Sequence, residues 1–308
     1  MSSEPLIFDT KGNSLEDGPG IRSVIFFKGC PLNCLWCQNP EGKKATAELW
    51  WESDRCVKDG GCMEVCPRGA ISPDHAFFID RNRCDGCMLC VEACASTALQ
   101  ISGQSMSVEE VVQQVIRYRA YFEATGGGVT LSGGEPMSAP EFVADLLKRL
   151  KEEGIHTLLQ TSGLFPLARF DSEVLPWLDA IYFDLKFMDP ALHRRYCGTG
   201  NETIQKNFVT LLRWSRSMGF ELLPRTPLIP GITDTDANLH SIADFLSGHG
   251  VERAALLPNN PLWLEKGPRL GEALVGTLEK RLRSFYETKR LEEIEELFSS
   301  YGIAASVA

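Results

Sequence analysis

The sequence has 308 residues, 44% of them hydrophobic and 23% charged, which is typical of a globular protein with one large domain, alone or with a small module. Its formal net charge of −10 argues against a nucleic-acid partner, whose phosphates would be repelled. No apolar run approaches a membrane span, and residues 1–5 lack the character of a signal peptide, so we expect a cytoplasmic protein without a membrane partner.

Cysteine is the most informative residue type in this composition. Ten of the eleven cysteines fall between residues 30 and 94. In a reducing compartment, thiols grouped in this way indicate metal or redox sites rather than disulfides. The remaining one, Cys197, stands apart, and we interpret it as a packing residue.

The first group of thiols lies on a loop after residues 21–27, an apolar run that predicts a buried strand. The loop carries Cys30, Cys34 and Cys37, and none of the five histidines is nearby in sequence. Three thiolates are one ligand short of a structural zinc site. They suit a cubane iron–sulfur cluster whose fourth iron is open to a small molecule. The alternative is a loop that binds zinc or no metal.

Residues 53–101 form a cysteine-dense interlude that predicts a ferredoxin-like module with two clusters. Its second half has the C-x2-C-x2-C-x3-C spacing of bacterial ferredoxins, and its first half keeps the same frame with Asp59 in place of the second cysteine. In two-cluster ferredoxins the fourth cysteine of each motif binds the other cluster. This rule assigns one cluster to Cys66, Cys84, Cys87 and Cys90, and the other to Cys56, Cys62, Cys94 and Asp59.

Three possibilities remain for the iron next to Asp59 in the second cluster, because a carboxylate is a harder ligand than a thiolate. Asp59 binds the iron, a water or small molecule binds it, or the iron is lost to leave a three-iron cluster. We favour ligation by Asp59. The alternative for the whole module is that it binds zinc or only stabilises the fold.

Strands and helices alternate through the rest of the chain. Ser107 and two following glutamates predict the start of a helix after the interlude, and residues 282–298 predict one or two helices in the tail. Apolar runs predict six strands, at residues 21–27, 128–132, 155–160, 180–185, 220–223 and 253–257. Continuous apolar strands separated by helices indicate parallel pairing. We therefore expect an α/β fold, a partial (β/α)6 TIM-like barrel made of residues 1–52 and 102–308, with residues 53–101 inserted as the ferredoxin-like module.

Polar residues follow each of the six predicted strands, at the end where parallel α/β barrels collect their functional groups. After the cysteine loop of the first strand, the candidates are Gly133, Gly134, Glu135, Gln160, Thr161, Asp184, Lys186, Arg225, Asn259 and Asn260. His156, within an apolar strand, is interpreted as a core histidine. Arg22 suits a solvated charge at a strand edge.

The C-x3-C-x-aromatic-C pattern, with Trp36 as the aromatic residue, resembles the cluster loop of radical S-adenosylmethionine enzymes. Three neighbouring segments narrow the resemblance to the activating enzymes of glycyl radical enzymes, the family of pyruvate formate-lyase activating enzyme. These segments are Asp17-Gly18-Pro19-Gly20-Ile21-Arg22, Phe26-Phe27-Lys28-Gly29-Cys30 and Cys37-Gln38-Asn39-Pro40-Glu41.

The resemblance implies the cofactors and the reaction. A 4Fe-4S cluster on Cys30, Cys34 and Cys37 binds S-adenosylmethionine at its open iron and cleaves it reductively. The 5′-deoxyadenosyl radical then abstracts hydrogen from a backbone glycine of a partner glycyl radical enzyme. Flavodoxin or ferredoxin is the expected reductant. The two auxiliary clusters would relay electrons or help to dock the partner.

The resemblance also implies roles at the strand ends. Gly133, Gly134 and Glu135 form the segment that holds the methionine amino group, and Asp184 and Lys186 belong to the cofactor site. Trp36, Gln160, Thr161, Arg225 and Asn260 complete the expected cofactor-binding set, and Arg22 would be part of the site wall. Gln160 replaces an acidic residue of pyruvate formate-lyase activating enzyme, which leaves open whether a monovalent cation binds there. Asn260 replaces a histidine of the same relative.

Two other classes of function compete with this reading. One is a radical enzyme that acts on a small molecule or a peptide, and the other is an electron carrier that uses only residues 53–101. Within the family, a ferredoxin-like insert is common in activators of dehydratases, decarboxylases and C–N or C–S lyases, and absent from the activator of pyruvate formate-lyase. The sequence does not identify the target.

Overall fold

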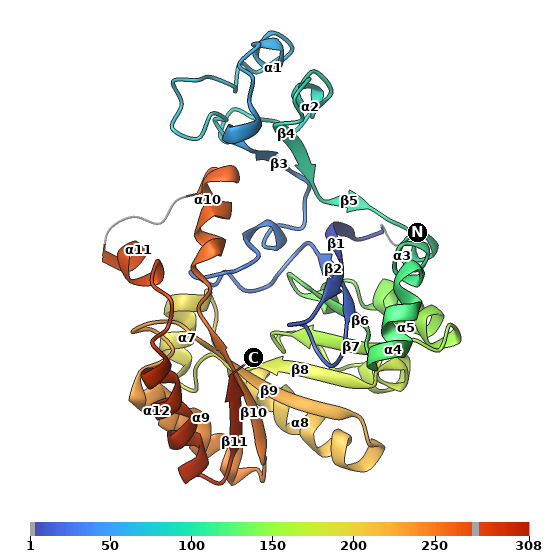
Figure 1. The fold of residues 1–308 in the computed structure, drawn as a ribbon, viewed down its shortest axis with the longest axis vertical. Helices are drawn as coiled ribbons and strands as arrows, with labels where there is room; N and C mark the ends of the chain where they lie inside the picture. The colour runs from blue at the N-terminus through green and yellow to red at the C-terminus, as the bar shows by residue number, and fades with distance from the viewer. Residues whose placement is uncertain (1–3, 273–276, 308) are drawn as a thin grey trace.

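The computed structural model describes residues 4–272 and 277–307, and a nine-stranded sheet dominates it (Figure 1). The strand order in this sheet is β11-β10-β9-β8-β7-β6-β2-β1-β5, and β3 and β4 form a separate pair. The strands are β1 (Leu6–Ser14), β2 (Arg22–Phe27), β3 (Glu48–Trp51), β4 (Leu99–Ser102), β5 (Gln104–Ser105), β6 (Gly128–Gly133), β7 (His156–Thr161), β8 (Ala180–Asp184), β9 (Glu221–Leu228), β10 (Arg253–Pro258) and β11 (Ala304–Val307).

All six predicted strands are present, and each pairs in parallel with its neighbour, from β2 through β6, β7, β8 and β9 to β10. Helices lie between consecutive strands and cover the outer face of the curved sheet (Figure 1). The predicted α/β partial barrel is therefore confirmed. The α-helices are α1 (Gly61–Glu64), α2 (Leu89–Glu92), α3 (Val108–Val115), α4 (Arg119–Thr125), α5 (Pro140–Glu152), α6 (Phe170–Glu173), α7 (Pro190–Cys197), α8 (Glu202–Met218), α9 (Asp236–Gly248), α10 (Lys266–Arg269), α11 (Thr277–Leu282) and α12 (Thr288–Ser300).

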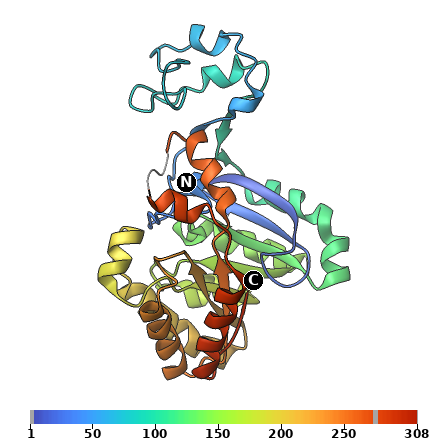
Figure 2. The same cartoon turned by 60° about the vertical axis from the view of Figure 1, so that its left-hand side comes forward.

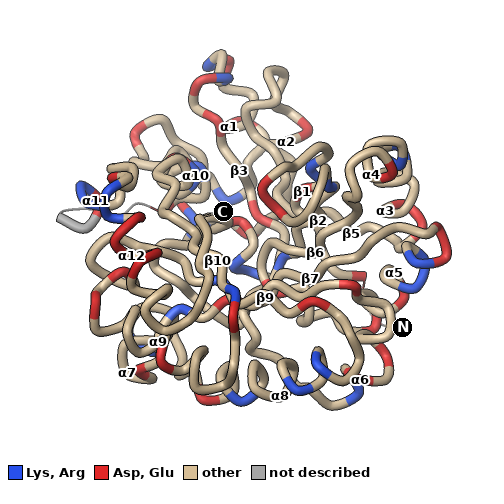
Figure 3. Tube along the Cα trace, turned by 60° about the horizontal axis from the view of Figure 1, so that its bottom comes forward, with Lys and Arg blue, Asp and Glu red and all other residues tan. Residues whose placement is uncertain are grey.

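The sheet extends beyond the six predicted strands at both sides. β1 pairs antiparallel with β2 and with β5, although the sequence predicted no strand before residue 21. β11 pairs in parallel with β10, after the predicted helices of the tail. No helix in the described part of the chain is long and apolar enough to cross a membrane. Figure 3 shows Lys and Arg interspersed with Asp and Glu along the chain.

The two faces of the barrel strands differ in character because side chains alternate along a strand. Ile25, Leu131 and Phe183 belong to the apolar core shared with the helices. The alternate positions carry polar side chains that hydrogen-bond from one strand to the next. Arg22, for example, donates to Thr130 Oγ1 at 2.6 Å and is fully buried, so it is not a solvated edge charge.

The interlude stands on the antiparallel β3–β4 pair, away from the main sheet, as both views show (Figures 1 and 2). Its two halves repeat the same backbone. α1 and α2 each follow a left-handed residue, Gly60 with φ 85° and Met88 with φ 64°. The N–H of Cys66 then donates to the carbonyl of Met63, as that of Cys94 does to Val91. The repeat in sequence is therefore also a repeat in structure.

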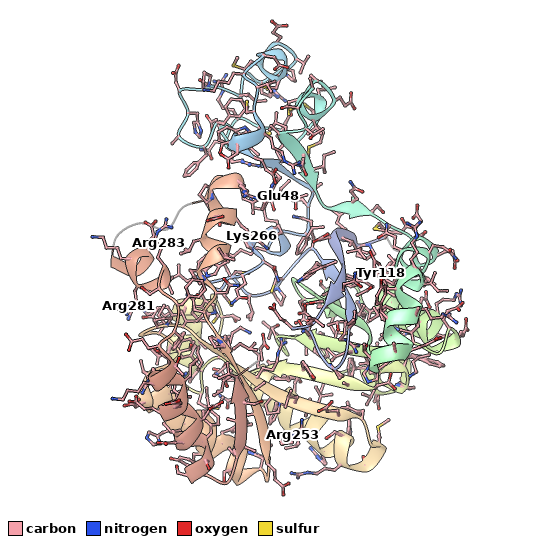
Figure 4. The ribbon with its side chains drawn as sticks, viewed as in Figure 1. Glu48, Tyr118, Arg253, Lys266, Arg281 and Arg283 are labelled. Carbon is pink, nitrogen blue, oxygen red and sulfur yellow. The ribbon has the colours of Figure 1, made fainter. Side chains whose placement is uncertain are left out.

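Charged side chains connect this module to the barrel. Figure 4 shows Glu48 and Lys266 at the junction. Buried Lys28 Nζ donates to Glu48 Oε2 at 3.1 Å and to the carbonyl of Glu41 at 2.6 Å, which ties β3 to the end of the cysteine loop. From α10, Arg269 lies 3.4 Å from Glu52 Oε1.

Candidate functional site

The cysteine loop follows β2 and is held by backbone hydrogen bonds to two other segments. On one side, the N–H groups of Gly29 and Cys30 donate to Lys44 and Lys43, both at 3.1 Å. On the other side, Asn33 and Leu35 donate to the last two carbonyls of α7. The loop is therefore fixed by contacts distant in sequence rather than by its own turns.

Trp36 anchors the loop in an apolar cluster. Its side chain is 3% exposed and packs edge-on against Phe187, with ring centroids 6.0 Å apart, and against Tyr196 at 6.4 Å. The same cluster includes Cys34 and Cys197, with Cys30 and Cys37 packed against it. The aromatic position of the motif thus contributes packing that excludes water around the thiols.

The surroundings shift the pKa values of the three thiols in different directions. Burial raises the pKa of Cys30 to about 12 and that of Cys37 to about 11. The neighbouring Cys197 thiol lowers the pKa of Cys34 to about 7. Among the described residues, no three His, Cys, Asp or Glu side chains are placed to hold a single metal ion. A cluster of several irons does not require such a group, because each thiolate binds a different iron.

Gly133 and Gly134 bring the end of β6 against the cysteine loop. A Cβ on Gly133, which has φ 102°, would lie 2.5 Å from the nitrogen of Phe27. A Cβ on Gly134 would lie 2.4 Å from the carbonyl oxygen of Gly29 and 2.5 Å from that of Gly42. Both positions require glycine for close backbone packing, a reason that the sequence pattern did not reveal.

Glu135 links β6 to the end of β7 within the same region. Its buried carboxylate accepts hydrogen bonds from Thr161 Oγ1 at 2.9 Å and from the N–H and Oγ of Ser162 at 2.9 and 2.6 Å. Burial raises its pKa, although these hydrogen bonds oppose the shift. The Glu135 charge lies close enough to Cys30 to contribute to the raised pKa of that thiol.

Gln160 occupies the inner face of β7. Its Oε1 accepts from Ser132 Oγ at 2.7 Å, and its Nε2 donates to Asp17 Oδ1 at 3.2 Å. An amide can serve an acceptor and a donor at the same time, whereas an acidic residue here would place two carboxylates side by side. The neighbouring Asp17 thus accounts for a neutral residue at this position.

Asp184, Lys186 and Arg225 form an ion-pair network between the end of β8 and the middle of β9, because β9 continues beyond the predicted strand to Leu228. Asp184 Oδ1 lies 2.8 Å from Arg225 Nη2, and Asp184 Oδ2 lies 3.2 Å from Lys186 Nζ. Burial opposes ionisation of Asp184, but the two cations lower its pKa overall. The charge of Lys186 also contributes to the lowered pKa of Cys34, so this network lies beside the cysteine loop.

Asn260 differs from the other predicted residues because its side chain is engaged locally. It is exposed and caps the following turn, accepting from the N–H of Leu262 at 3.1 Å. The neighbouring Asn259 is buried and bonds the carbonyl of Leu282 and the indole of Trp263.

Two buried asparagines that sequence reasoning missed hold the segment after Lys186. Asn201 donates to the carbonyls of Phe187 and Met188, at 2.6 and 3.1 Å. Asn238 donates to the carbonyl of Lys186 at 3.0 Å. The signal that could have found them is an amide at a buried position near the start of an amphipathic helix.

The cysteines of the interlude fall into two groups. A small cavity is lined by one set of four thiols, which are Cys66, Cys84, Cys87 and Cys90. In the other group, Cys94, Cys56 and Asp59 lie close enough to Cys62 to help raise its pKa, after burial as the main cause. Asp59 is exposed and accepts from the N–H of Gly61 at 3.3 Å.

Comparisons with known proteins agree with this fold. The family model of the Radical SAM superfamily matches residues 24–243. The chain is 36% identical to the (2S)-3-sulfopropanediol dehydratase activating enzyme of Klebsiella oxytoca, over 98% of this chain and 97% of the relative. It is 34% identical to the trans-4-hydroxy-L-proline dehydratase activating enzyme of Clostridioides difficile, over 96% of each chain. The solved radical SAM methyltransferase of Sphaerobacter thermophilus shares the fold, with a TM-score of 0.56 and 17% identity over 99% of this chain and 77% of that one.

The chain therefore belongs to the radical SAM superfamily and, within it, to the activating enzymes of glycyl radical enzymes. Membership implies S-adenosylmethionine and one 4Fe-4S cluster as cofactors. The loop at residues 30–37 fits such a cluster, because it offers three thiols in an apolar, water-poor environment.

Proposed function

We propose that this chain uses the site around its cysteine loop to generate a radical on a backbone glycine of a partner glycyl radical enzyme. When bound, the reduced cluster and S-adenosylmethionine supply the radical that abstracts the hydrogen. The observation that carries the proposal is the convergence of one three-thiol loop with polar groups at the ends of β6, β7 and β8 and within β9.

The side chains have separate tasks in this proposal. Cys30, Cys34 and Cys37 hold three irons. The ion pair of Lys186 with Asp184 keeps the ammonium charged in a buried position, where it is suited to meet the carboxylate of the cofactor. Glu135 fixes the ends of β6 and β7 through Thr161 and Ser162, so that the site is formed before the cofactor binds.

The module at residues 53–101 is proposed to hold two auxiliary iron–sulfur clusters. The repeated backbone of α1 and α2 supports this assignment, and so does the crossed grouping, in which Cys66 joins the thiols of the second half and Cys94 those of the first. Hydrogen bonds from the N–H groups of Ala70 to Cys66 and of Leu99 to Cys94 suit thiolate ligands. Asp59 is the proposed fourth ligand of its group.

The reductant and the target follow from the same proposal. A flavodoxin or ferredoxin would deliver electrons through the auxiliary clusters in the cytoplasm. Both relatives named above activate dehydratases, so glycyl radical dehydratases are the first candidates for the target, followed by decarboxylases and C–N or C–S lyases.

Isotope transfer tests the function. A candidate target carrying glycine deuterated at the α carbon is incubated anaerobically with the reconstituted enzyme, S-adenosylmethionine and dithionite. We expect deuterium in the 5′-deoxyadenosine, and an unlabelled target serves as the control. Deuterium-free 5′-deoxyadenosine formed in the presence of every glycyl radical enzyme encoded in the same genome would instead favour a small molecule or peptide as the substrate.

A further inference from the structure

The two proposed cluster sites of residues 53–101 differ in their position along the β3–β4 pair. The inner group consists of the four thiols Cys66, Cys84, Cys87 and Cys90. The outer group consists of Cys56, Asp59, Cys62 and Cys94. Because β3 and β4 lead away from the barrel (Figure 1), one of these groups lies closer to the cysteine loop than the other.

The barrel end of the strand pair is fixed beside the cysteine loop. Glu48 begins β3 and pairs with Ser102, the last residue of β4. Lys28, just before the loop, donates to Glu48 Oε2 at 3.1 Å. Gly103 packs on the same lysine, because a Cβ at Gly103 would lie 2.3 Å from Lys28 Cδ. Both strands therefore meet the chain immediately before Cys30.

The inner group lies against the strand pair close to this end. Leu49, which follows Glu48 in β3, lines the same cavity as the four inner thiols. The outer group is attached farther along, where the N–H of Leu99 donates to Cys94 Sγ at 3.4 Å. Leu99 pairs with Trp51, the last residue of β3, and Trp51 lies about 7 Å beyond Leu49 along the strand. The outer group is therefore the more distant from the cysteine loop.

A second set of contacts joins the inner group to the other end of the cysteine loop. Arg81, on the turn that leads into Cys84, donates through Nη2 to the carbonyl of Arg269 at 3.2 Å. Arg269 is the last residue of α10, and Lys266 is the first. Lys266 Nζ lies 2.7 Å from Oε1 of buried Glu41, on the segment that leaves the loop. α10 thus spans from the inner group to the cysteine loop.

We propose that the inner group passes electrons directly to the cysteine loop, and that the outer group reaches the loop only through the inner group. Electron transfer inside a protein slows steeply as the distance between the two sites grows. The inner site loses one electron and the loop site gains it, so no bond is made or broken and no proton moves. The electron comes from the protein reductant proposed above, a flavodoxin or ferredoxin. The inference rests on the proposed function, since it requires a cluster at each of the three sites.

Electron paramagnetic resonance of the reduced, reconstituted holoenzyme tests which group is near the loop. A reduced cluster speeds the relaxation of a neighbouring cluster's signal, and the effect falls steeply with distance. The signal to follow is the one that changes on addition of S-adenosylmethionine. Cys90→Ala removes a ligand of the inner group and Cys62→Ala one of the outer group, at the equivalent buried position of each repeat. We expect slower relaxation, measured by microwave power saturation, in Cys90→Ala, and relaxation near that of the wild type in Cys62→Ala.

Two results would overturn the inference while the proposed function stands. One is a change in Cys62→Ala that equals or exceeds the change in Cys90→Ala. The other is an unchanged rate of loop-cluster reduction in Cys90→Ala, followed by freeze-quench spectra after mixing with reduced flavodoxin, where we expect most of the reduction to be lost. If Cys90→Ala does not fold or keeps all its iron, Cys87→Ala removes another inner ligand and is judged by the same criteria.

The wild-type enzyme separates this inference from the proposed function. A signal that responds to S-adenosylmethionine, together with iron for one cluster per chain, would overturn the inference alone. No signal that responds to S-adenosylmethionine would overturn the proposed function, and this inference with it.

Discussion

Glu135 and Asp184 are carboxylates withdrawn from water in the same site, yet their pKa values shift in opposite directions. The partners of Glu135 are hydroxyl and N–H groups, and burial raises its pKa. Burial also opposes the ionisation of Asp184, but Arg225 and Lys186 lower its pKa overall. Neutral hydrogen-bond donors only partly offset the cost of removing a carboxylate from water, whereas two neighbouring cations more than offset this cost.

Replacing Asp184 by Asn should therefore destabilise the folded enzyme. The change leaves Arg225 and Lys186 largely buried without their counter-charge, at a cost of about 3 kcal/mol in the free energy of unfolding. Denaturant unfolding at neutral pH measures this cost. The matched control is Asp236→Asn, because the ion pair of exposed Asp236 with Arg290 is screened by solvent and its loss should cost far less.

The pH dependence of this difference follows from the direction of the Asp184 shift. A carboxyl whose folded-state pKa is lowered stabilises the protein above its unfolded pKa, and this contribution is lost as the pH falls toward the folded-state value. The difference in the free energy of unfolding between the wild type and Asp184→Asn should become smaller as the pH is lowered from neutral through the ordinary range of aspartate pKa values. A difference that stays constant with pH would show that the charge of Asp184 does not stabilise the folded enzyme.

Sequence reasoning assigned the three loop thiols and Lys186 to the ends of two different strands, and the structure brings these groups close together. Their roles in binding the cluster and the cofactor stay predictions. The environment of Arg22 and Cys197 was not predictable, because each is buried by contacts distant in sequence. Arg22 reaches Thr130, and Cys197 reaches Cys34.

At the scale of elements, the cysteine loop depends on the backbone of β6. Gly134→Ala should displace Gly29 or Gly42 at either side of the loop, because both carbonyl oxygens occupy the space of the new Cβ. We expect selective loss of the iron of the loop cluster, measured as iron per chain after anaerobic reconstitution. Gly248→Ala is the control, since a Cβ at this position in α9 meets open space. Full iron content in Gly134→Ala would show that the loop tolerates the displacement.

The interlude has its own test at Asp59, which takes the place of a cysteine in the repeat. Asp59→Cys should leave the iron content equal or higher and change the spectrum of one auxiliary cluster, because a thiolate replaces a carboxylate. Asp54→Cys, also exposed but outside the motif, should change neither. An Asp59→Cys spectrum identical to that of the wild type would show that Asp59 is not a ligand.

The elements that the sequence failed to predict have weak local patterns. β1 carries polar residues at Asp9, Lys11 and Asn13 and is a strand because β2 and β5 pair with it on both sides. β11 has four small residues and depends on β10 for its hydrogen bonds. The six central strands were predictable because their burial requires continuous apolar runs.

At the scale of the whole molecule, the module with α1 and α2 stands apart from the barrel and meets it through β3, β4 and α10 (Figures 1 and 4). An electron relay in this module should be needed only when the electrons come from a protein reductant. Cys90→Ala should therefore keep cleavage of S-adenosylmethionine with dithionite and lose most of it with reduced flavodoxin. The rate of 5′-deoxyadenosine formation measures both. Equal rates with the two reductants would argue that the module serves docking instead.

The central claim is that the loop of Cys30, Cys34 and Cys37 generates a radical on a partner protein. The most direct measurement is the electron paramagnetic resonance spectrum of a glycyl radical enzyme from the same genome after anaerobic incubation with this enzyme, S-adenosylmethionine and reductant. We predict an oxygen-sensitive glycyl radical signal with the wild type and none with Cys34→Ala. A signal that persists in Cys34→Ala, or no signal from any such partner with a fully loaded wild type, would contradict the account.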